Sequence, residues 1–309
     1  MFGGSAGLKI ESLVLLLGCL ALGWVVARIA KPPQGLGQSL NWFVIHVALP
    51  ALVLDLIPRV QLDPHLWLLP VAMWFVFIGG WAVAAFAGAR LGWSRARIGA
   101  VALSAGLGNT ALVGFPLIEA LRGKDGLVLA AFTDQLGGSI ALAVGGITVA
   151  AIYGGGKPEP RVIIRRVLLF PPFLALVAGF IFGALGGLPL AVQGLVSRIG
   201  ATLTPIALFS IGLSFTLRVD RARLGAASTA LGWKLALAPV LVYAIGVGIG
   251  IEGLVMAVAV LQAGMAPMVS TSILCQQYGL ETEVANAALG AGLAISLFSV
   301  PWVNHLLPM

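Results

Sequence analysis

Charged residues are scarce in this 309-residue sequence, since only 9% of its residues are Asp, Glu, Lys or Arg. A soluble globular protein carries roughly 25% charged residues, which keep its surface hydrated. A chain that is 60% apolar does not supply such a surface, whereas a protein solvated by lipid does not need one. The composition therefore excludes an ordinary soluble domain and indicates an integral membrane protein.

Further absences narrow the class of protein. Only two cysteines occur, Cys19 and Cys275, and both lie in apolar stretches, so no disulfide framework is expected. The initial segment MFGGSAGLKIES has no basic n-region and no cleavage site, so its first apolar run should be a retained helix. The sequence has no His-Glu-x-x-His motif, no cluster of metal ligands, no nucleotide-binding loop and no paired catalytic set. We expect no enzyme activity, no metal and no cofactor, and the scattered basic residues do not form a stripe for nucleic acid.

Apolar runs of about 20 residues, the length that crosses the hydrocarbon core of a bilayer, recur along the whole chain. We expect ten transmembrane helices and no separate soluble domain, which makes the fold class an all-α polytopic membrane protein. The predicted spans are 8–30, 38–57, 66–89, 98–121, 127–152, 167–188, 191–217, 223–250, 253–278 and 283–306.

The basic residues are divided unequally between the two sides of the predicted membrane. One side holds Arg28, Lys31, Arg90, Arg95, Arg97, Lys157, Arg161, Arg165, Arg166, Arg218, Arg221 and Arg223. The other side holds Lys9, Arg59, Arg122, Lys124 and Arg198. Because cytoplasmic loops carry the excess of Lys and Arg, we expect both termini outside the cytoplasm of an inner (plasma) membrane.

The two halves of the chain resemble each other. VALPALVLDLIP at 47–58 is similar to LTPIALFSIGLS at 203–214, and GLGNTALVGFPLIEALRG at 106–123 is similar to QAGMAPMVSTSILCQQYG at 262–279. Five spans in each half is an odd number, so the second copy must enter the membrane inverted. We predict five-helix repeats at 1–153 and 167–309, joined by a cytoplasmic linker at 154–166.

The fourth and ninth spans carry Gly, Pro and hydroxyl or amide residues at their midpoints. Proline removes a backbone donor, and unpaired backbone is costly in hydrocarbon unless it lines a cavity or is buried in protein. Matched interrupted helices in inverted halves point to a transporter site, where half-helix N-termini favour an anion. Ordinary proline kinks are the alternative. We predict that helices four and nine are broken, cross each other and form a substrate site from Asn109, Thr110, Pro116, Gln262, Pro267, Ser270 and Thr271.

Ionisable residues inside the membrane are costly and are candidates for function. Asp134, beside Gln135 in the fifth span, fits a proton or cation site, and a satisfied polar group near the interface is the alternative. Lys234 in the eighth span could pair with Asp134, as part of the structure, or with a substrate carboxylate. Three glycines on the sixth span, at 179, 183 and 187, predict close helix packing, either internal or between protomers.

The quoted motifs resemble those of a known family. GLGNTALVGFPL resembles the fourth-helix motif of the auxin efflux carrier family, APMVSTSILCQQYG is similar to its ninth-helix motif, and TPIALFSIGLS fits its seventh helix. The resemblance covers essentially the whole chain. It departs at the ninth helix, where Ser270 or Thr271 stands at the position at which many members carry Asn, and this leaves the substrate open.

The resemblance implies a bacterial-type carrier with scaffold helices 1, 2, 6 and 7 and a mobile core of helices 3–5 and 8–10. Family substrates are small organic anions such as auxin, malonate or malate, and carriers of this kind tend to form homodimers. We therefore expect a secondary active transporter of organic anions that works by alternating access, with proton or sodium coupling left open. A channel or a membrane ligand sensor on the same scaffold is the alternative.

Overall fold

The computed structural model describes residues 10–60, 63–156, 160–214 and 223–308. Four of the basic residues used for orientation, Lys9, Lys157, Arg218 and Arg221, lie outside the described residues, as do the start of the first predicted span and the end of the seventh. Within the described ranges the chain is helical and contains no strand, apart from one isolated β-bridge.

The helices of the first half begin with α1 and end with α7. Their bounds are α1 Ile10–Ile29, α2 Leu36–Phe43, η1 Val44–Ala48, α3 Leu49–Leu56, η2 Ile57–Arg59, η3 Pro64–Trp67, α4 Leu68–Leu91, α5 Arg95–Gly106, α6 Gly114–Thr133, η4 Asp134–Gly138, η5 Ala141–Gly146 and α7 Ile147–Tyr153. Gly123 divides α6, because its φ of 70° lies in the left-handed region that favours glycine. This break lies between the residues that we predicted for the fourth span and those that we predicted for the fifth.

The second half continues with shorter helices. Their bounds are α8 Pro160–Leu168, α9 Pro171–Ala184, α10 Leu190–Ala201, α11 Leu203–Ser214, α12 Leu224–Leu231, η7 Gly232–Leu237, α13 Ala238–Gly248, α14 Gly253–Ala263, α15 Val269–Gln277 and α16 Thr282–Leu306. Helix α8 occupies a stretch that we expected to be a plain linker. Its sequence PRVIIRRVL places apolar and basic residues at helical spacing after an initial proline, which suits an amphipathic helix.

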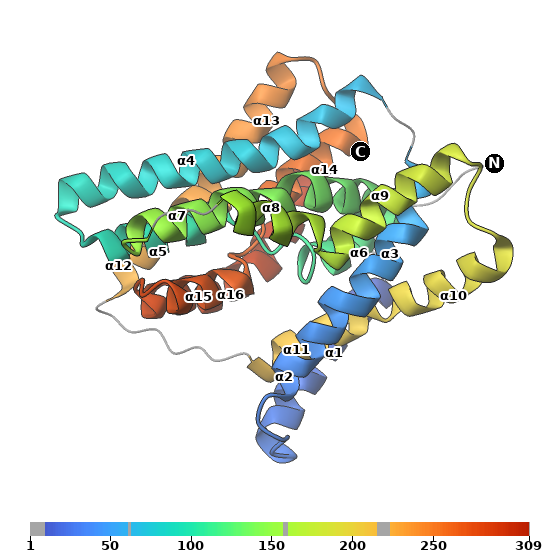
Figure 1. Cartoon of the computed structure of the whole chain (residues 1–309), viewed down its shortest axis with the longest axis horizontal. Helices are drawn as coiled ribbons and strands as arrows, with labels where there is room; N and C mark the ends of the chain where they lie inside the picture. The colour runs from blue at the N-terminus through green and yellow to red at the C-terminus, as the bar shows by residue number, and fades with distance from the viewer. Residues whose placement is uncertain (1–9, 61–62, 157–159, 215–222, 309) are drawn as a thin grey trace.

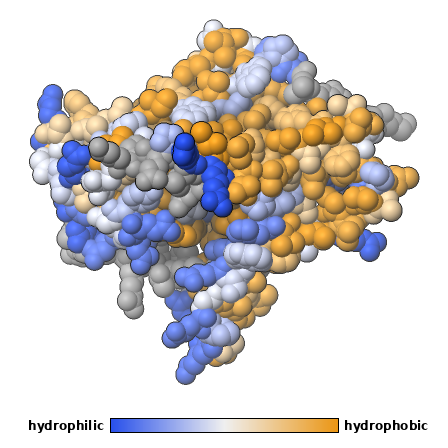
Figure 2. Space-filling view, in the orientation of Figure 1, coloured by the Kyte–Doolittle hydropathy of each residue, from blue (hydrophilic) through white to orange (hydrophobic). Residues whose placement is uncertain are grey.

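Six helical segments of the described chain are long and apolar enough to cross a membrane. They are Leu36–Arg59, Pro64–Leu91, Gly114–Tyr153, Leu190–Leu213, Leu224–Gly248 and Thr282–Leu306, and shorter apolar helices lie at Val14–Ile29, Pro171–Ala184 and Gly253–Ala263. Figure 2 shows a broad apolar surface on the face in view, with hydrophilic residues gathered mainly to the left and at the lower tip. Large apolar side chains such as Ile29, Leu190 and Phe298 are exposed. These features confirm a helical, multi-pass membrane protein.

The helices form two groups. Helix α1 packs on α11, α3 packs on α9 and α10, and α2 packs on α11, and we call this set (α1–α3 and α9–α11) the first bundle. Helices α4–α7 and α12–α16 pack mainly on one another and form the second bundle. In Figure 1, α1, α2, α3, α10 and α11 lie together at the lower right, while α4, α5 and α12 extend to the left. Helix α6 contacts both bundles.

Glycines allow the closest helix crossings in the first bundle. A Cβ placed on Gly23 would lie 2.2 Å from the backbone oxygen of Phe209, and one placed on Gly212 would lie 2.3 Å from that of Leu20. The glycines of the sixth predicted span are also used inside the chain, because Gly179 faces Ile57 and Gly183 faces Pro58. Of the two alternatives, packing within the chain or packing between protomers, these two residues therefore show the first.

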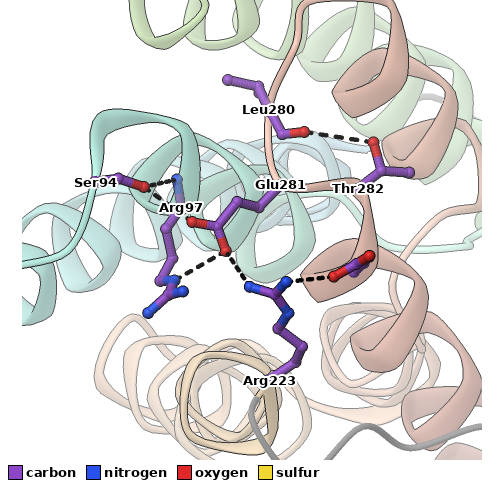
Figure 3. Close-up of polar contacts among 7 residues, drawn as sticks. Ser94, Arg97, Arg223, Leu280, Glu281 and Thr282 are labelled. Carbon is purple, nitrogen blue, oxygen red and sulfur yellow. Dashed lines mark hydrogen bonds and ion pairs between the residues drawn. The ribbon is translucent and has the colours of Figure 1, made fainter.

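A cluster of charges ties three helix ends of the second bundle together (Figure 3). Glu281, just before α16, accepts hydrogen bonds from Ser94 Oγ at 2.9 Å, Arg97 Nε at 2.9 Å and Arg223 Nη1 at 3.2 Å. Arg223 also pairs with Glu283 at 2.5 Å. Since Ser94 and Arg97 lie at the start of α5 and Arg223 precedes α12, one carboxylate joins α5, α12 and α16.

We expect Glu281→Gln to lower the stability of the protein by about 2 kcal/mol, because hydrogen bonds to a charged group contribute roughly 1.5–3 kcal/mol. Glu283→Gln is the matched control, since that side chain is 68% exposed and its single ion pair should contribute less than about 1 kcal/mol. Thermal unfolding of the two purified variants measures the difference. Equal melting temperatures for the two variants would contradict a structural role for Glu281.

Candidate functional site

Two helices of the second bundle are interrupted, and the interruptions lie against each other. Helix α5 ends at Gly106 and α6 begins at Gly114, while α14 ends at Ala263 and α15 begins at Val269. The Asn109 amide donates to the Ala266 carbonyl at 2.7 Å, and the Met268 amide donates to the Leu107 carbonyl at 3.0 Å, which gives an antiparallel bridge between Gly108 and Pro267. Each interruption thereby satisfies backbone groups that the other leaves free, as a buried break requires.

Asn109 accepts two backbone hydrogen bonds where the first interruption ends and α6 begins. Its side-chain oxygen accepts from the Leu112 amide at 3.1 Å, and its backbone carbonyl accepts from the Gly114 amide at 3.0 Å. The residue is 1% exposed, and its side-chain Nδ2 has no hydrogen-bond partner. Pro116 lies in the first turn of α6 and Pro267 lies in the second interruption itself. The fold therefore uses the oxygen of the Asn109 amide and leaves the donor unused.

Gln262 connects the two interruptions from the end of α14. Its Nε2 donates to the backbone oxygens of Thr110 at 3.3 Å and Ala130 at 3.4 Å. Its Oε1 is buried without a partner and lies against Gly114, where an added Cβ would come within 2.5 Å of it. This amide fixes the position of the first interruption and leaves one free acceptor.

Asp134 is buried beside the first interruption among neutral donors. It is 1% exposed and accepts from Thr110 Oγ1 at 2.5 Å, Gln135 Nε2 at 2.8 Å and Ser139 Oγ at 3.4 Å. The Oε1 of Gln135 is buried and has no partner. Among the described residues no basic side chain pairs with this carboxylate.

Lys234 lies on the other side of the same interruption, in η7. It is 1% exposed, and the described part of the chain offers it neither a hydrogen bond nor an ion pair. A Cβ on Gly108 would lie 2.8 Å from its Nζ, so the glycine lets the end of this side chain come close to the interruption. The methyl group of Thr110 also lies toward Gly108, and its hydroxyl bonds the Asp134 carboxylate. The ion pair that the sequence left open is not formed.

Ser270 and Thr271 lie in the first turn of α15. The helix begins after Met268 with no side-chain cap, Thr271 is 1% exposed, and its Oγ1 has no partner. The hydroxyl of Ser272 is likewise without a partner. The structure thus places the predicted substrate residues in the two interruptions or in the helices that flank them, while Asp134 and Gln135 lie in η4 and Lys234 lies in η7.

Two cavities lie toward opposite ends of the α14–α15 segment. The first has a volume of about 300 Å³ and is lined by Leu56, Arg59, Val60, Lys124, Asp125, Val128, Leu129 and Leu254. The second has a volume of about 290 Å³ and is lined by Ser139, Leu142, Ala143, Ile147, Phe170, Ser270, Ile273, Leu274 and Gln277. Leu254 lies at the start of α14, whereas the second cavity follows α15 from Ser270 to Gln277.

Sequence reasoning missed two polar residues. Glu119 on α6 accepts from Thr204 Oγ1 of α11 at 3.3 Å, which links the two bundles. It is a carboxylate inside a predicted span, so the rule that selected Asp134 would also have selected it. Ser139 both lines the second cavity and bonds Asp134, but an isolated serine in an apolar run carries no sequence signal.

Comparison with known proteins gives one matching family model and three similar relatives. The sequence model of the family described as membrane transport protein matches residues 9–303. An uncharacterized transporter of Methanothermobacter thermautotrophicus is 27% identical, covering 97% of this chain and 98% of the relative. A protein of Rhizobium meliloti named "Putative malonate transporter" is 28% identical over 97% of this chain and 95% of its own. A rice protein named "Probable auxin efflux carrier component 5a" is 28% identical over 46% of this chain and 42% of its own.

Proposed function

The chain belongs to the membrane transport protein family, that of the auxin efflux carriers, and within it we propose a secondary active transporter of small organic anions that works by alternating access. The observation that carries this proposal is the crossing of two interrupted helices with buried, unpartnered polar atoms around it. Buried polar groups are normally paired, so a cluster of unpaired ones suits a site that a ligand completes. The names of the Rhizobium and rice relatives indicate organic anions as the substrates.

Ten membrane crossings in two inverted repeats, 1–153 and 167–309 around the linker 154–166, are the architecture that we propose. The interrupted pairs α5–α6 and α14–α15 would then be the fourth and ninth crossings, with the turn at Gly123 between the fourth and fifth. The first bundle contains the helices expected of the scaffold, and the second bundle contains those expected of the mobile core. This grouping supports movement of the second bundle as a unit against the first.

The substrate carboxylate would bind where unpaired donors gather. Asn109 Nδ2 and Thr271 Oγ1 are both buried and unpartnered, and the start of α15 adds the positive end of a helix. Gln262, Pro116 and Pro267 hold this arrangement in place. The two cavities, at opposite ends of the α14–α15 segment, would be the routes by which each side of the membrane reaches the site.

Ion coupling would be the task of Asp134 and its neighbours. The described residues give the carboxylate three neutral donors and no cation, so either a proton or a sodium ion would offset its buried charge. Gln135 offers a further free oxygen at its side-chain Oε1. Lys234, buried beside Gly108 of the first interruption, would supply a positive charge for the substrate carboxylate.

Solute counterflow tests the transporter proposal against its alternatives. Proteoliposomes are loaded with unlabelled malonate, malate, indole acetate or hexanoate, and the same compound is added outside in labelled form. A carrier gives a transient accumulation above equilibrium for at least one compound, which saturates with concentration. A channel gives flux without accumulation and a ligand sensor gives no flux, so either result would reject the proposal.

The orientation that we propose puts both termini outside the cytoplasm of the plasma membrane. With Cys19 and Cys275 replaced by alanine, Gly156→Cys should react only with a membrane-permeant thiol reagent in intact cells. Leu185→Cys, 75% exposed in the turn after α9, should react with an impermeant reagent. The opposite pattern at these two positions would invert the topology.

A homodimer joined through the first bundle also belongs to the proposal, although Gly179 and Gly183 do not contribute to it because they pack on Ile57 and Pro58. The mass of the protein in lipid nanodiscs shows whether one or two chains are present. A particle with the mass of one chain would remove the dimer without affecting the transport mechanism.

A further inference from the structure

Helix α8 has three different faces. Its residue Ile163 is buried in the hydrophobic core, and the helix packs on η5 of the second bundle. Ile164 and Leu168 lie one helical turn apart on a second face, and each is more than half exposed. Arg161 and Arg165, also one turn apart, form a third face and are exposed. Because each arginine lies three residues before one of the exposed apolar residues, an apolar stripe and a basic stripe run side by side along this helix.

Two such stripes suit the boundary between the hydrocarbon and the headgroups of a membrane. A helix that carries basic residues beside an apolar face lies in this boundary, with its apolar side chains among the acyl chains and its basic ones at the headgroups. In Figure 2 a strongly hydrophilic patch near the centre of the face in view coincides with the position of α8 in Figure 1, and it adjoins the broad apolar surface. The surroundings of α8 therefore change from polar to apolar across the helix.

The charge of this surface selects an anionic partner. The nine residues of α8 include three arginines and no acidic residue. The sequence from 157 to 166 holds four basic residues and one acidic residue. A group of this size next to a membrane helix is attracted to anionic lipid headgroups, which give the cytoplasmic leaflet its negative surface potential. The orientation proposed above puts α8 at that leaflet.

Helix α8 is also the connection between the two bundles. It follows α7 of the second bundle and leads through Leu169 to Phe170, which lines the second cavity, and then to α9 of the first bundle. A lipid bound at α8 would therefore hold this connection at the membrane surface.

We propose that α8 is a binding surface for an anionic phospholipid, with Ile164 and Leu168 against the acyl chains and Arg161 and Arg165 on the phosphate group. Guanidinium groups form charge-assisted hydrogen bonds with phosphate oxygens. A headgroup with a net negative charge, such as that of phosphatidylglycerol, binds better than phosphatidylcholine, because the positive choline offsets the charge of the phosphate. This interaction does not depend on which solute the chain carries, or on whether it is a carrier.

Quenching of a fluorophore on α8 tests the proposal. The full chain, with Cys19 and Cys275 replaced by alanine and Ile164→Cys labelled with the fluorophore, is placed in nanodiscs of phosphatidylcholine and phosphatidylglycerol in equal amounts. A quenching spin label is carried by one lipid or by the other, at the same mole fraction. We expect phosphatidylglycerol to quench at least fivefold more effectively, since one basic residue at an anionic surface contributes about this factor.

Charge variants supply the controls. Arg161→Gln combined with Arg165→Gln should lower the preference for phosphatidylglycerol to about one, whereas lysine at both positions should keep most of it. Lys124→Gln combined with Arg198→Gln removes the same two charges from exposed positions on α6 and α10, and should leave the preference unchanged. Because all four side chains are exposed, the melting temperatures should stay close to that of the parent protein.

Three results would overturn the inference. Equal quenching by the two lipids would show that lipid covers this face without selection of the headgroup. Weak quenching by both lipids would show that protein, such as a second copy of the chain, covers the face instead. An equal loss of preference in the Lys124 and Arg198 double variant would show that the net charge of the protein, and not α8, attracts the lipid.

Discussion

Asn109→Ser should weaken the binding of the organic anion by about 10- to 100-fold while the melting temperature of the protein stays close to that of the wild type. The side-chain oxygen of Asn109 accepts from the Leu112 amide, and a serine hydroxyl can accept at the same spacing of three residues. The unpaired Nδ2 is removed entirely. A hydrogen bond to a charged group contributes roughly 1.5–3 kcal/mol, which gives the expected loss of affinity.

Asn109→Ala is the companion variant that separates the two roles of this amide. It should lose the same affinity and, in addition, about 1–3 kcal/mol of stability, because the buried Leu112 amide is left without an acceptor. Titration of each variant and thermal unfolding without ligand measure the two effects. Wild-type affinity in Asn109→Ser would show that Nδ2 does not touch the substrate, and would move the site away from the crossing.

Gly212→Ala should destabilise the first bundle by about 3 kcal/mol, at the upper end of what an added methyl group costs in a packed interior. The new Cβ would lie 2.3 Å from the Leu20 carbonyl oxygen and 3.0 Å from the Trp24 amide nitrogen. Both neighbours are backbone atoms of α1, so no side chain can turn aside and the two helices must separate. Loss of the monodisperse peak on heating, followed by size-exclusion chromatography, measures the shift in melting temperature.

Gly18→Ala on α1 is the control for this substitution. Nothing lies within 4 Å of a Cβ at Gly18, and alanine favours a helix over glycine by up to about 1 kcal/mol. The control should therefore be neutral or slightly stabilising. A Gly212→Ala protein as stable as Gly18→Ala would mean that α1 and α11 do not approach as closely as the structure shows.

The sequence predicted the structure best where an unusual residue type stands at an unusual position in a predicted span. Glycine and proline at the middle of apolar runs predicted interrupted helices around Asn109 and Pro267, and the structure has breaks at both places. The sequence did not predict which residues contact one another. Lys234 and Asp134 have opposite charges and similar depths, yet whether they meet depends on how η7 and η4 pack around Thr110, which no local pattern records.

The glycines of α9 are a second case in which the sequence did not predict the contact partner. Their spacing predicts a close contact but not its partner, and the partner proved to be Ile57 and Pro58 of the same chain. Helix α8 was not predicted for a different reason. A short amphipathic segment rich in basic residues has the composition of a loop. Residues whose role depends on burial by distant elements, such as Ser139, can be found only in three dimensions.

The reciprocal pairing of the two interruptions also sets the order of events during synthesis. The Asn109 amide and the Leu107 carbonyl find their partners at Ala266 and Met268, which leave the ribosome more than 150 residues later. At roughly 5–20 residues per second, the first interruption waits about 10–30 s before its backbone partners exist. During that interval the free backbone groups of this segment must be hydrated or covered by the insertion machinery, because unpaired backbone is costly in hydrocarbon.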